Sequence, residues 1–151
     1  MIKTNKYLVF LYFFSITVII TYAGTIIKNH YFPLEKSIIS DKSLVFKFFI
    51  MVVLAPIYET FIFQYIPIKI IGLMRIKKKI YSYAIAILAS GLLFGIVHAK
   101  NPIYAIFGFI VGCIFAYMFI LFSIRKDFNP FLAVVILHGT VNLFGLLFVG
   151  I

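Results

Sequence analysis

Five long apolar stretches make up most of this 151-residue chain, and each has close to the roughly 20 residues that an α-helix needs to cross a bilayer. Hydrophobic residues account for 64% of the chain and charged residues for 12%, whereas soluble domains are about half apolar and about a quarter charged. Backbone polar groups in lipid must be satisfied within their own segment, which favours helices. The sequence therefore predicts an all-α, polytopic integral membrane bundle. The expected spans are residues 7–27, 44–74, 81–98, 102–124 and 129–151, and residues 28–43 are expected to form a polar connection between the first two.

These spans form a single transmembrane domain over residues 1–151, with the polar motifs confined to residues 44–151. The net charge of +10 would suggest nucleic acid in a soluble protein. Here the basic residues lie between the apolar stretches, as topology determinants do, so we expect the lipid bilayer and no nucleic acid as partner. Their excess on one side predicts a multi-pass cell-membrane protein with a cytoplasmic N-terminus. A competing interpretation takes the first stretch as a cleaved signal peptide, because residues 21–23 resemble a small-residue cleavage site.

Four polar side chains interrupt the apolar stretches. Glu59 lies near the middle of the second stretch, and His98 ends the third. His138 and Asn142 share one face of the last stretch because they are four residues apart. A charged side chain at a helix centre costs about 2.5–3.5 kcal/mol on insertion scales, so such residues are normally partnered inside the bundle. We therefore predict one intramembrane site that contains all four.

The residue types suggest acid–base chemistry at this site. A buried Glu59 is a candidate general base for water, and His138 and Asn142 can donate hydrogen bonds to an oxyanion. Two simpler interpretations remain open. Glu59 can be a protonated residue that hydrogen-bonds a neighbouring helix, and His98 can lie at the membrane interface.

Two prolines, Pro56 and Pro67, stand on either side of Glu59, and we expect them to kink or loosen the second span. Thr60 and Gln64 are four residues apart and can hydrogen-bond each other or a neighbouring helix.

Two pairs of glycines mark places where helix backbones can approach closely. Gly91 and Gly95 flank Phe94, one turn before His98, whereas residues 108 and 112 are interpreted as ordinary helix packing.

Straight helices do not bring the four polar residues to one level. Their heights above the inner membrane face would be about 20 Å for Glu59, about 14 Å for His138 and about 28 Å for His98. The site therefore requires helix tilt, a kink at Pro56, or helix ends that differ from the predicted ones.

Three elements in chain order resemble the motifs of the CPBP family, the type II CAAX-protease-like intramembrane endopeptidases, also called the Abi family. The family pattern is Glu-Glu-x-x-x-Arg, Phe-x-x-x-His and His-x-x-x-Asn. The matching elements here are Glu59-Thr60-x-x-x-Gln64, Phe94-x-x-x-His98 and His138-x-x-x-Asn142. Thr60 and Gln64 depart from the pattern, and together they replace an ion pair with a neutral pair that can hydrogen-bond. The resemblance identifies the chain as a short variant with a Glu-Thr-x-x-x-Gln first motif.

The resemblance implies an intramembrane endopeptidase that cleaves a membrane-associated peptide or protein. Glu59 and His98 would activate a water molecule, and His138 and Asn142 would stabilise the oxyanion. Thr60, Gln64 and Phe94 would have supporting roles. No cofactor is expected, although zinc held by Glu59, His98 and His138 is possible.

Family analogies include processing of bacteriocin-type peptides and immunity against them. The alternatives are a catalytically inactive immunity or scaffold protein of the same fold, which the short chain and the two departures favour, and a proton- or ion-coupled carrier.

Overall fold

The computed structural model describes residues 5–32, 42–74 and 76–149 of the chain. Within these residues, 5 helices are long and apolar enough to cross a membrane, which confirms the all-α bundle of about five spans. The protein is therefore a multi-pass membrane protein, and the side on which its N-terminus lies stays a prediction. Four of the spans are α1 (Lys6–Tyr31), α5 (Lys79–Val97), α6 (Pro102–Arg125) and α7 (Pro130–Phe144), which continues as the π-helical η3 (Gly145–Val149).

The remaining span, Leu44–Leu73, is one continuous helix in which α-helical and π-helical segments alternate. Its segments are α2 (Leu44–Lys47), η1 (Phe48–Leu54), α3 (Ala55–Thr60), η2 (Phe61–Tyr65) and α4 (Ile66–Leu73).

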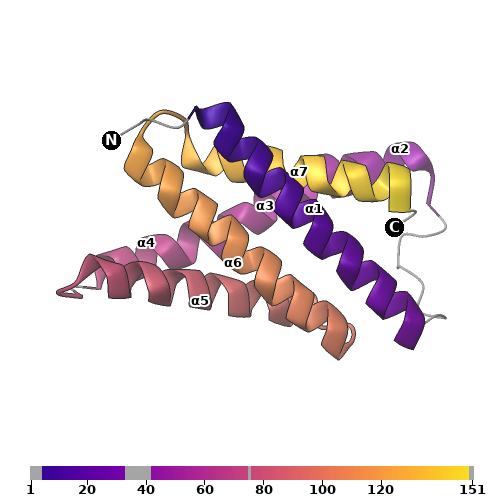
Figure 1. The fold of residues 1–151 in the computed structure, drawn as a ribbon, viewed down its shortest axis with the longest axis horizontal. Helices are drawn as coiled ribbons and strands as arrows, with labels where there is room; N and C mark the ends of the chain where they lie inside the picture. The colour runs from indigo at the N-terminus through magenta and orange to yellow at the C-terminus, as the bar shows by residue number, and fades with distance from the viewer. Residues whose placement is uncertain (1–4, 33–41, 75, 150–151) are drawn as a thin grey trace.

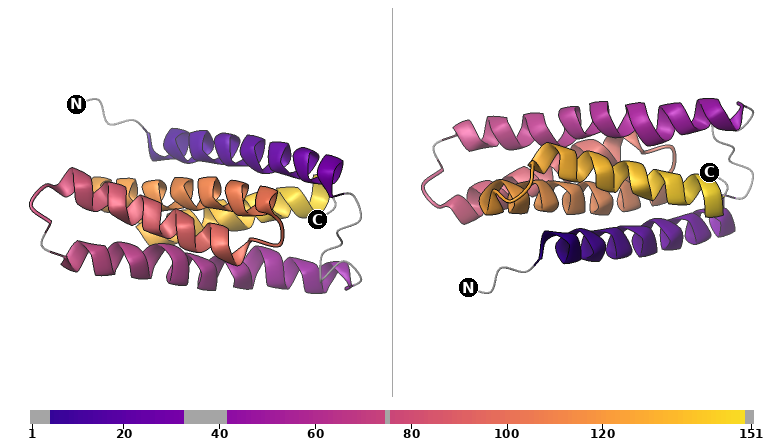
Figure 2. Two further views of the ribbon diagram at one scale, coloured as in Figure 1. Left: turned by 90° about the horizontal axis from the view of Figure 1, so that it is seen from below. Right: turned by 90° about the horizontal axis from the view of Figure 1, so that it is seen from above.

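The helices form three layers, which the two views of Figure 2 show from opposite sides. The Leu44–Leu73 helix forms one outer layer, and α1 forms the other. Helices α5, α6 and α7 lie between them, and in Figure 1 α7 crosses behind α1 while α6 runs beside α1. Fully buried side chains fill the space between α6 and α7. They include Phe115, Met118, Phe122, Val134 and Leu137.

Asparagine and proline residues define where three helices begin. The side chain of Asn5 accepts the Tyr7 N–H at 3.0 Å, and that of Asn101 accepts the Tyr104 N–H at 2.9 Å. Asn129 caps α7 in the same way, and Pro follows at the first helical position of both α6 and α7. These are favoured residues for helix starts, because Asn satisfies a free N–H and Pro has none to satisfy.

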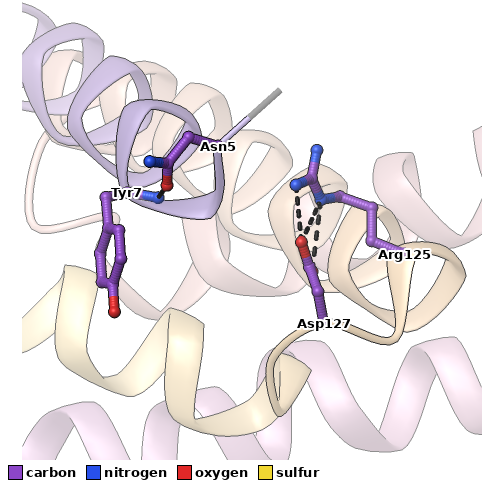
Figure 3. Close-up of polar contacts among 4 residues, drawn as sticks. All are labelled: Asn5, Tyr7, Arg125 and Asp127. Carbon is purple, nitrogen blue, oxygen red and sulfur yellow. Dashed lines mark hydrogen bonds and ion pairs between the residues drawn. The ribbon is translucent and has the colours of Figure 1, made fainter. Parts of the chain in front are cut away.

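The turn before α7 is closed by an ion pair. The Nη2 atom of Arg125 lies 2.6 Å from Oδ2 of Asp127, and Figure 3 shows this pair near Asn5 and Tyr7 at the start of α1. The hydrogen bond from Arg125 lowers the pKa of Asp127 from its ordinary value. Lys126, between them, has a left-handed φ of 57°, as a residue that follows a helix end often does.

The first span is longer than predicted. Residues 28–43 were expected to form a polar connection, but α1 continues to Tyr31. The reason is that Lys28 is buried, with its Nζ atom 6.0 Å from the centre of the Tyr104 ring. Residues 33–41 of the expected connection lie outside the described residues, as do the last two residues of the expected fifth span.

Helices α5 and α6 are held together by glycines that face each other. A Cβ atom on Gly112 would lie 2.6 Å from Cβ of Phe94 and 3.0 Å from Cα of Gly91. A Cβ atom on Gly108 would lie 3.1 Å from Cβ of His98 and 3.3 Å from Cα of Gly95. The two predicted small-residue faces are therefore two halves of one close helix contact, and residues 108 and 112 also set the position of Phe94 and His98.

Gly112→Ala is expected to destabilise the protein by about 1–3 kcal/mol, because the added methyl group overlaps a closely packed neighbour. It is also expected to lower any activity that depends on His98, since Phe94 is displaced. The matched control is Gly72→Ala, because a Cβ atom there meets no heavy atom within 4 Å. Thermal unfolding of the two variants in detergent measures their stability. An equal effect of the two substitutions would contradict the close contact at Gly112.

Candidate active site

The segment that carries Glu59 is flanked by two π-helical segments, and each ends just before a proline. Proline lacks an N–H and its ring clashes with the carbonyl four residues earlier. A wider π-helical turn relieves that clash, and such turns are frequent at functional sites. The N–H of Ala55 accordingly bonds the carbonyl of Ile50, and that of Ile66 bonds the carbonyl of Phe61. The predicted loosening around Glu59 therefore takes the form of two changes of helix type.

Glu59 meets both histidines. Its Oε2 atom lies 3.9 Å from Nε2 of His98 and 3.9 Å from Nε2 of His138. The spread in height calculated for straight helices therefore does not keep the three residues apart, and the helix that carries Glu59 is interrupted by two π-helical segments. A separation of 3.9 Å is too long for a direct hydrogen bond and is a distance that one bridging water can span.

His98 is fixed in one tautomer. Its Nδ1 atom lies 2.8 Å from the carbonyl oxygen of Phe94. A carbonyl can only accept, so Nδ1 carries the hydrogen, and in the neutral ring the Nε2 atom that faces Glu59 has a free lone pair. When Glu59 is ionised, its carboxylate and this nitrogen are both acceptors, so a donor such as water is needed to join them.

Phe94 orients the two imidazole rings. It stacks on His98, with ring centres 4.3 Å apart and planes at 24°, and makes a T-shaped contact with His138, with ring centres 5.8 Å apart. Phe115 packs on His138 from another side at 4.8 Å. His138 is buried, and its Nδ1 atom has no hydrogen-bond partner among the described residues. The aromatic contacts limit how either imidazole can turn.

Asn142 is bound to the backbone of the Glu59 helix. Its Nδ2 atom donates to the carbonyl oxygen of Met51 at 2.8 Å. In the π-helical pattern, the N–H of residue 56 would donate to this carbonyl, but Pro56 has no N–H. The side chain of Asn142 therefore supplies the hydrogen that the helix lacks.

Gly139 allows the close approach that this hydrogen bond needs. A Cβ atom at this position would lie 2.7 Å from the carbonyl oxygen of Val52, the neighbour of Met51. Met51 could not be identified from the sequence, because every residue type has a backbone carbonyl that can accept a hydrogen bond. The available signal was Pro56, five residues further along the chain.

Thr60 and Gln64 do not form the hydrogen bond that their spacing suggested. Both side chains are fully buried, and Thr60 Oγ1 and both polar atoms of the Gln64 side chain have no partner among the described residues. The π-helical turn between them changes their relative direction from that of an ideal α-helix. Ser90 on α5 is a third buried residue of this kind. The supporting roles of Thr60 and Gln64 stay predictions.

Restoring the charged family pattern tests how residues 60 and 64 are coupled. Either Thr60→Glu or Gln64→Arg alone is expected to cost about 3–5 kcal/mol, because it places one unpaired charge at a fully buried position. The double variant is expected to recover at least about half of the summed loss, since the two charges can pair. Unfolding midpoints of the four proteins measure this coupling, and simple additivity would show that the side chains cannot reach each other.

Beside the histidines lies a partly open pocket with a volume of about 140 Å³. His98, His138 and Asn142 contribute to its wall, so three of the four predicted site residues border one space. The opposite wall comes from α1, through residues such as Thr21 and Gly24. The four residues therefore lie close together, with Glu59 near the histidines and Asn142 bonded to the Glu59 helix, although Glu59 does not line the pocket.

The zinc alternative needs a tighter arrangement than the one observed. Ligand atoms on a tetrahedral zinc are about 3.3 Å apart, because each lies about 2.0–2.1 Å from the metal. The carboxylate and imidazole atoms here are 3.9 Å apart, and among the described residues no three His, Cys, Asp or Glu side chains are arranged to hold a metal. We therefore derive no step that uses a metal.

Comparison with known proteins agrees with the motifs. Residues 41–144 match the family model described as type II CAAX prenyl endopeptidase Rce1-like, a stretch that includes Glu59, His98, His138 and Asn142. No curated protein and no solved structure matches the chain. The match covers more than half of the chain, and α1 lies outside it. On these grounds the protein belongs to the Rce1-like family of type II CAAX endopeptidases.

Proposed function

We propose that this protein is an intramembrane endopeptidase that hydrolyses a peptide bond of a membrane-associated peptide or small protein. The observation that carries the proposal is the convergence of Glu59 with two imidazoles from different helices, each at 3.9 Å. A carboxylate and a neutral imidazole that both accept hydrogen bonds are a suitable pair to hold and deprotonate water. Family membership supports the same class of reaction.

In the proposed reaction, one water molecule lies between Glu59 and His98 and donates a hydrogen bond to each. Its oxygen attacks the scissile carbonyl as Glu59 takes the proton, and a tetrahedral oxyanion forms. The same proton then passes to the leaving nitrogen as the C–N bond breaks, which releases an amine and a carboxylic acid. No oxidant, reductant or second substrate is required.

The oxyanion is proposed to be stabilised by His138 and Asn142. A carboxamide has two N–H groups, so donation of one to Met51 leaves the other for the substrate. Each such donor is commonly worth about 100-fold or more in rate. In this scheme Asn142 has two functions, because it fixes the Glu59 helix and also binds the oxyanion.

The first experiment compares cleavage by the purified full chain with cleavage by His98→Ala, using a randomised short-peptide library in proteoliposomes. His98→Ala is expected to lower cleavage by at least about 100-fold, because one partner of the water is lost. His30→Ala is the control, since His30 is exposed near the end of α1. Equal cleavage by His98→Ala and the parent would refute the proposed function, and an inactive parent would favour the scaffold protein.

A chelator challenge addresses zinc separately. We expect cleavage to survive incubation with a strong chelator. Loss of activity that returns when zinc is added would show instead that Glu59, His98 and His138 rearrange around a metal.

A further inference from the structure

A cluster of lysines lies where α4 ends and α5 begins. Lys69 belongs to α4, Lys77 and Lys78 precede α5, and Lys79 is its first residue. All four side chains are exposed, and we call this group the basic tip. The sequence has no Asp or Glu between residues 60 and 126, so no acidic residue lies near the basic tip along the chain.

The basic tip differs from the other basic turn of the protein. Before α7, the guanidinium of Arg125 is paired with the carboxylate of Asp127. Among residues 5–32, 42–74 and 76–149, no ion pair involves a lysine of the basic tip. The positive charge of the basic tip is therefore available to an anion from outside the chain.

Apolar side chains are exposed beside these lysines. Leu73 at the end of α4 is 83% exposed, and Ile80 in the first turn of α5 is 66% exposed. The next residue, Tyr81, is also exposed, and its ring centre lies 5.6 Å from Nζ of Lys78. Tyrosine and lysine are typical of the membrane interface, because each has an apolar body and a polar end. The basic tip is therefore suited to the level of the lipid headgroups.

The position of the basic tip in the bundle supports this placement. The ends of α4 and α5 extend beyond the other helices, at the same end of the bundle as the start of α1 (Figures 1 and 2). In the predicted orientation this end is cytoplasmic. The cytoplasmic leaflet carries the anionic lipids of a cell membrane, and clustered lysines next to a membrane span attract them.

We propose that the basic tip is a binding site for the phosphate headgroups of anionic phospholipids. Its lysines pair with the phosphates, and Leu73 and Ile80 lie against the acyl chains just below. An acidic soluble peptide has the same charge, but it offers no acyl region to these two exposed side chains. The inference does not depend on the peptidase function, because none of the lysines belongs to the candidate active site.

The test uses the full chain in proteoliposomes and the fluorescence of one introduced tryptophan. The chain contains no Trp, so Tyr81→Trp places the single fluorophore at the basic tip and keeps an aromatic ring beside Lys78. Quenching by brominated phosphatidylglycerol and by brominated phosphatidylcholine gives the relative affinity for the two lipids. We expect a preference for phosphatidylglycerol of about fivefold or more, because each lysine near an anionic surface contributes about that factor.

High salt is expected to reduce this preference. The Debye length falls from about 10 Å at 0.1 M salt to about 3 Å at 1 M, so exposed lysines are screened. A preference that is the same at both salt concentrations would contradict binding through the basic tip.

A triple variant of the Tyr81→Trp protein tests the lysines directly. Replacement of Lys77, Lys78 and Lys79 by Gln is expected to bring the relative affinity to within about twofold of equality. The matched control makes the same three Lys→Gln changes, and the same change in net charge, at the opposite end of the bundle. Its positions are Lys42, Lys47 and Lys100. The control is expected to keep the preference of the parent.

Three results would overturn the inference. Equal quenching by the two brominated lipids in the Tyr81→Trp protein would show that the basic tip does not select an anionic headgroup. The same loss of preference in both triple variants would attribute it to net charge. No lipid preference, together with binding of a labelled oligoglutamate peptide to the chain in phosphatidylcholine vesicles, would assign the lysines to an acidic peptide instead. Peptide cleavage enters none of these measurements, so the proposed function is tested separately.

Discussion

Glu59→Gln is expected to lower peptide cleavage by at least about 100-fold without unfolding the protein. The substitution keeps the shape of the side chain but removes the base that takes the proton from water, a contribution commonly worth 10²–10⁴-fold. The histidines stay in place, because His98 is held by the Phe94 carbonyl and by the Phe94 ring. Initial cleavage rates and thermal unfolding of the same preparation measure the two effects separately.

The control for Glu59→Gln is Asp127→Asn, which makes the same carboxylate-to-carboxamide change in the turn before α7. Asp127→Asn is expected to leave the cleavage rate within about twofold of the parent, because a partly exposed ion pair contributes little. A Glu59→Gln protein that cleaves at the parent rate would show that Glu59 is a structural hydrogen-bonding residue, the simpler interpretation raised by the sequence.

Asn142→Ala is expected to lower stability by about 1–3 kcal/mol, because it leaves the carbonyl of Met51 without a donor. The same substitution in a Pro56→Ala background is expected to cost clearly less. Alanine at position 56 restores a backbone N–H, and that N–H can donate to Met51 in the π-helical pattern. Unfolding free energies of the four proteins give the coupling directly.

Cleavage rates in the same four proteins separate the two functions of Asn142. If the residue only fixes the Glu59 helix, Pro56→Ala restores activity together with stability. If it also binds the oxyanion, stability returns and kcat stays low by about 100-fold. Equal destabilisation by Asn142→Ala in both backgrounds would contradict the account of Met51.

The spans could be predicted for two reasons. A bilayer requires about 20 apolar residues per crossing, and backbone groups in lipid must be hydrogen-bonded within the segment, which favours a helix. The error at the end of α1 has a specific cause. Lys28 was interpreted as part of a polar connection, but its side chain is buried near Tyr104. A sequence does not show which lysine lies against a ring on another helix.

The proximity of the four polar residues could be predicted from the sequence, because a carboxylate, two imidazoles and a carboxamide are costly in lipid unless they meet. Their geometry could not be predicted. Calculations with straight helices separated Glu59 from His98, since residue spacing does not reveal where a helix widens. The same limit explains the missing hydrogen bond between Thr60 and Gln64, because their spacing fixes neither the turn between them nor the direction of either side chain.

The π-helical segment Phe61–Tyr65 has a consequence for insertions and deletions. A turn closed by a bond to the fifth residue contains one residue more than an α-helical turn. Deletion of a single residue from this segment would let the helix wind evenly from one proline to the next. Since each residue of an α-helix turns it by about 100°, the half that carries Glu59 would rotate by about that angle relative to the half that ends at Leu73. The chain would still cross the bilayer, with its carboxylate facing fatty acyl chains instead of imidazoles.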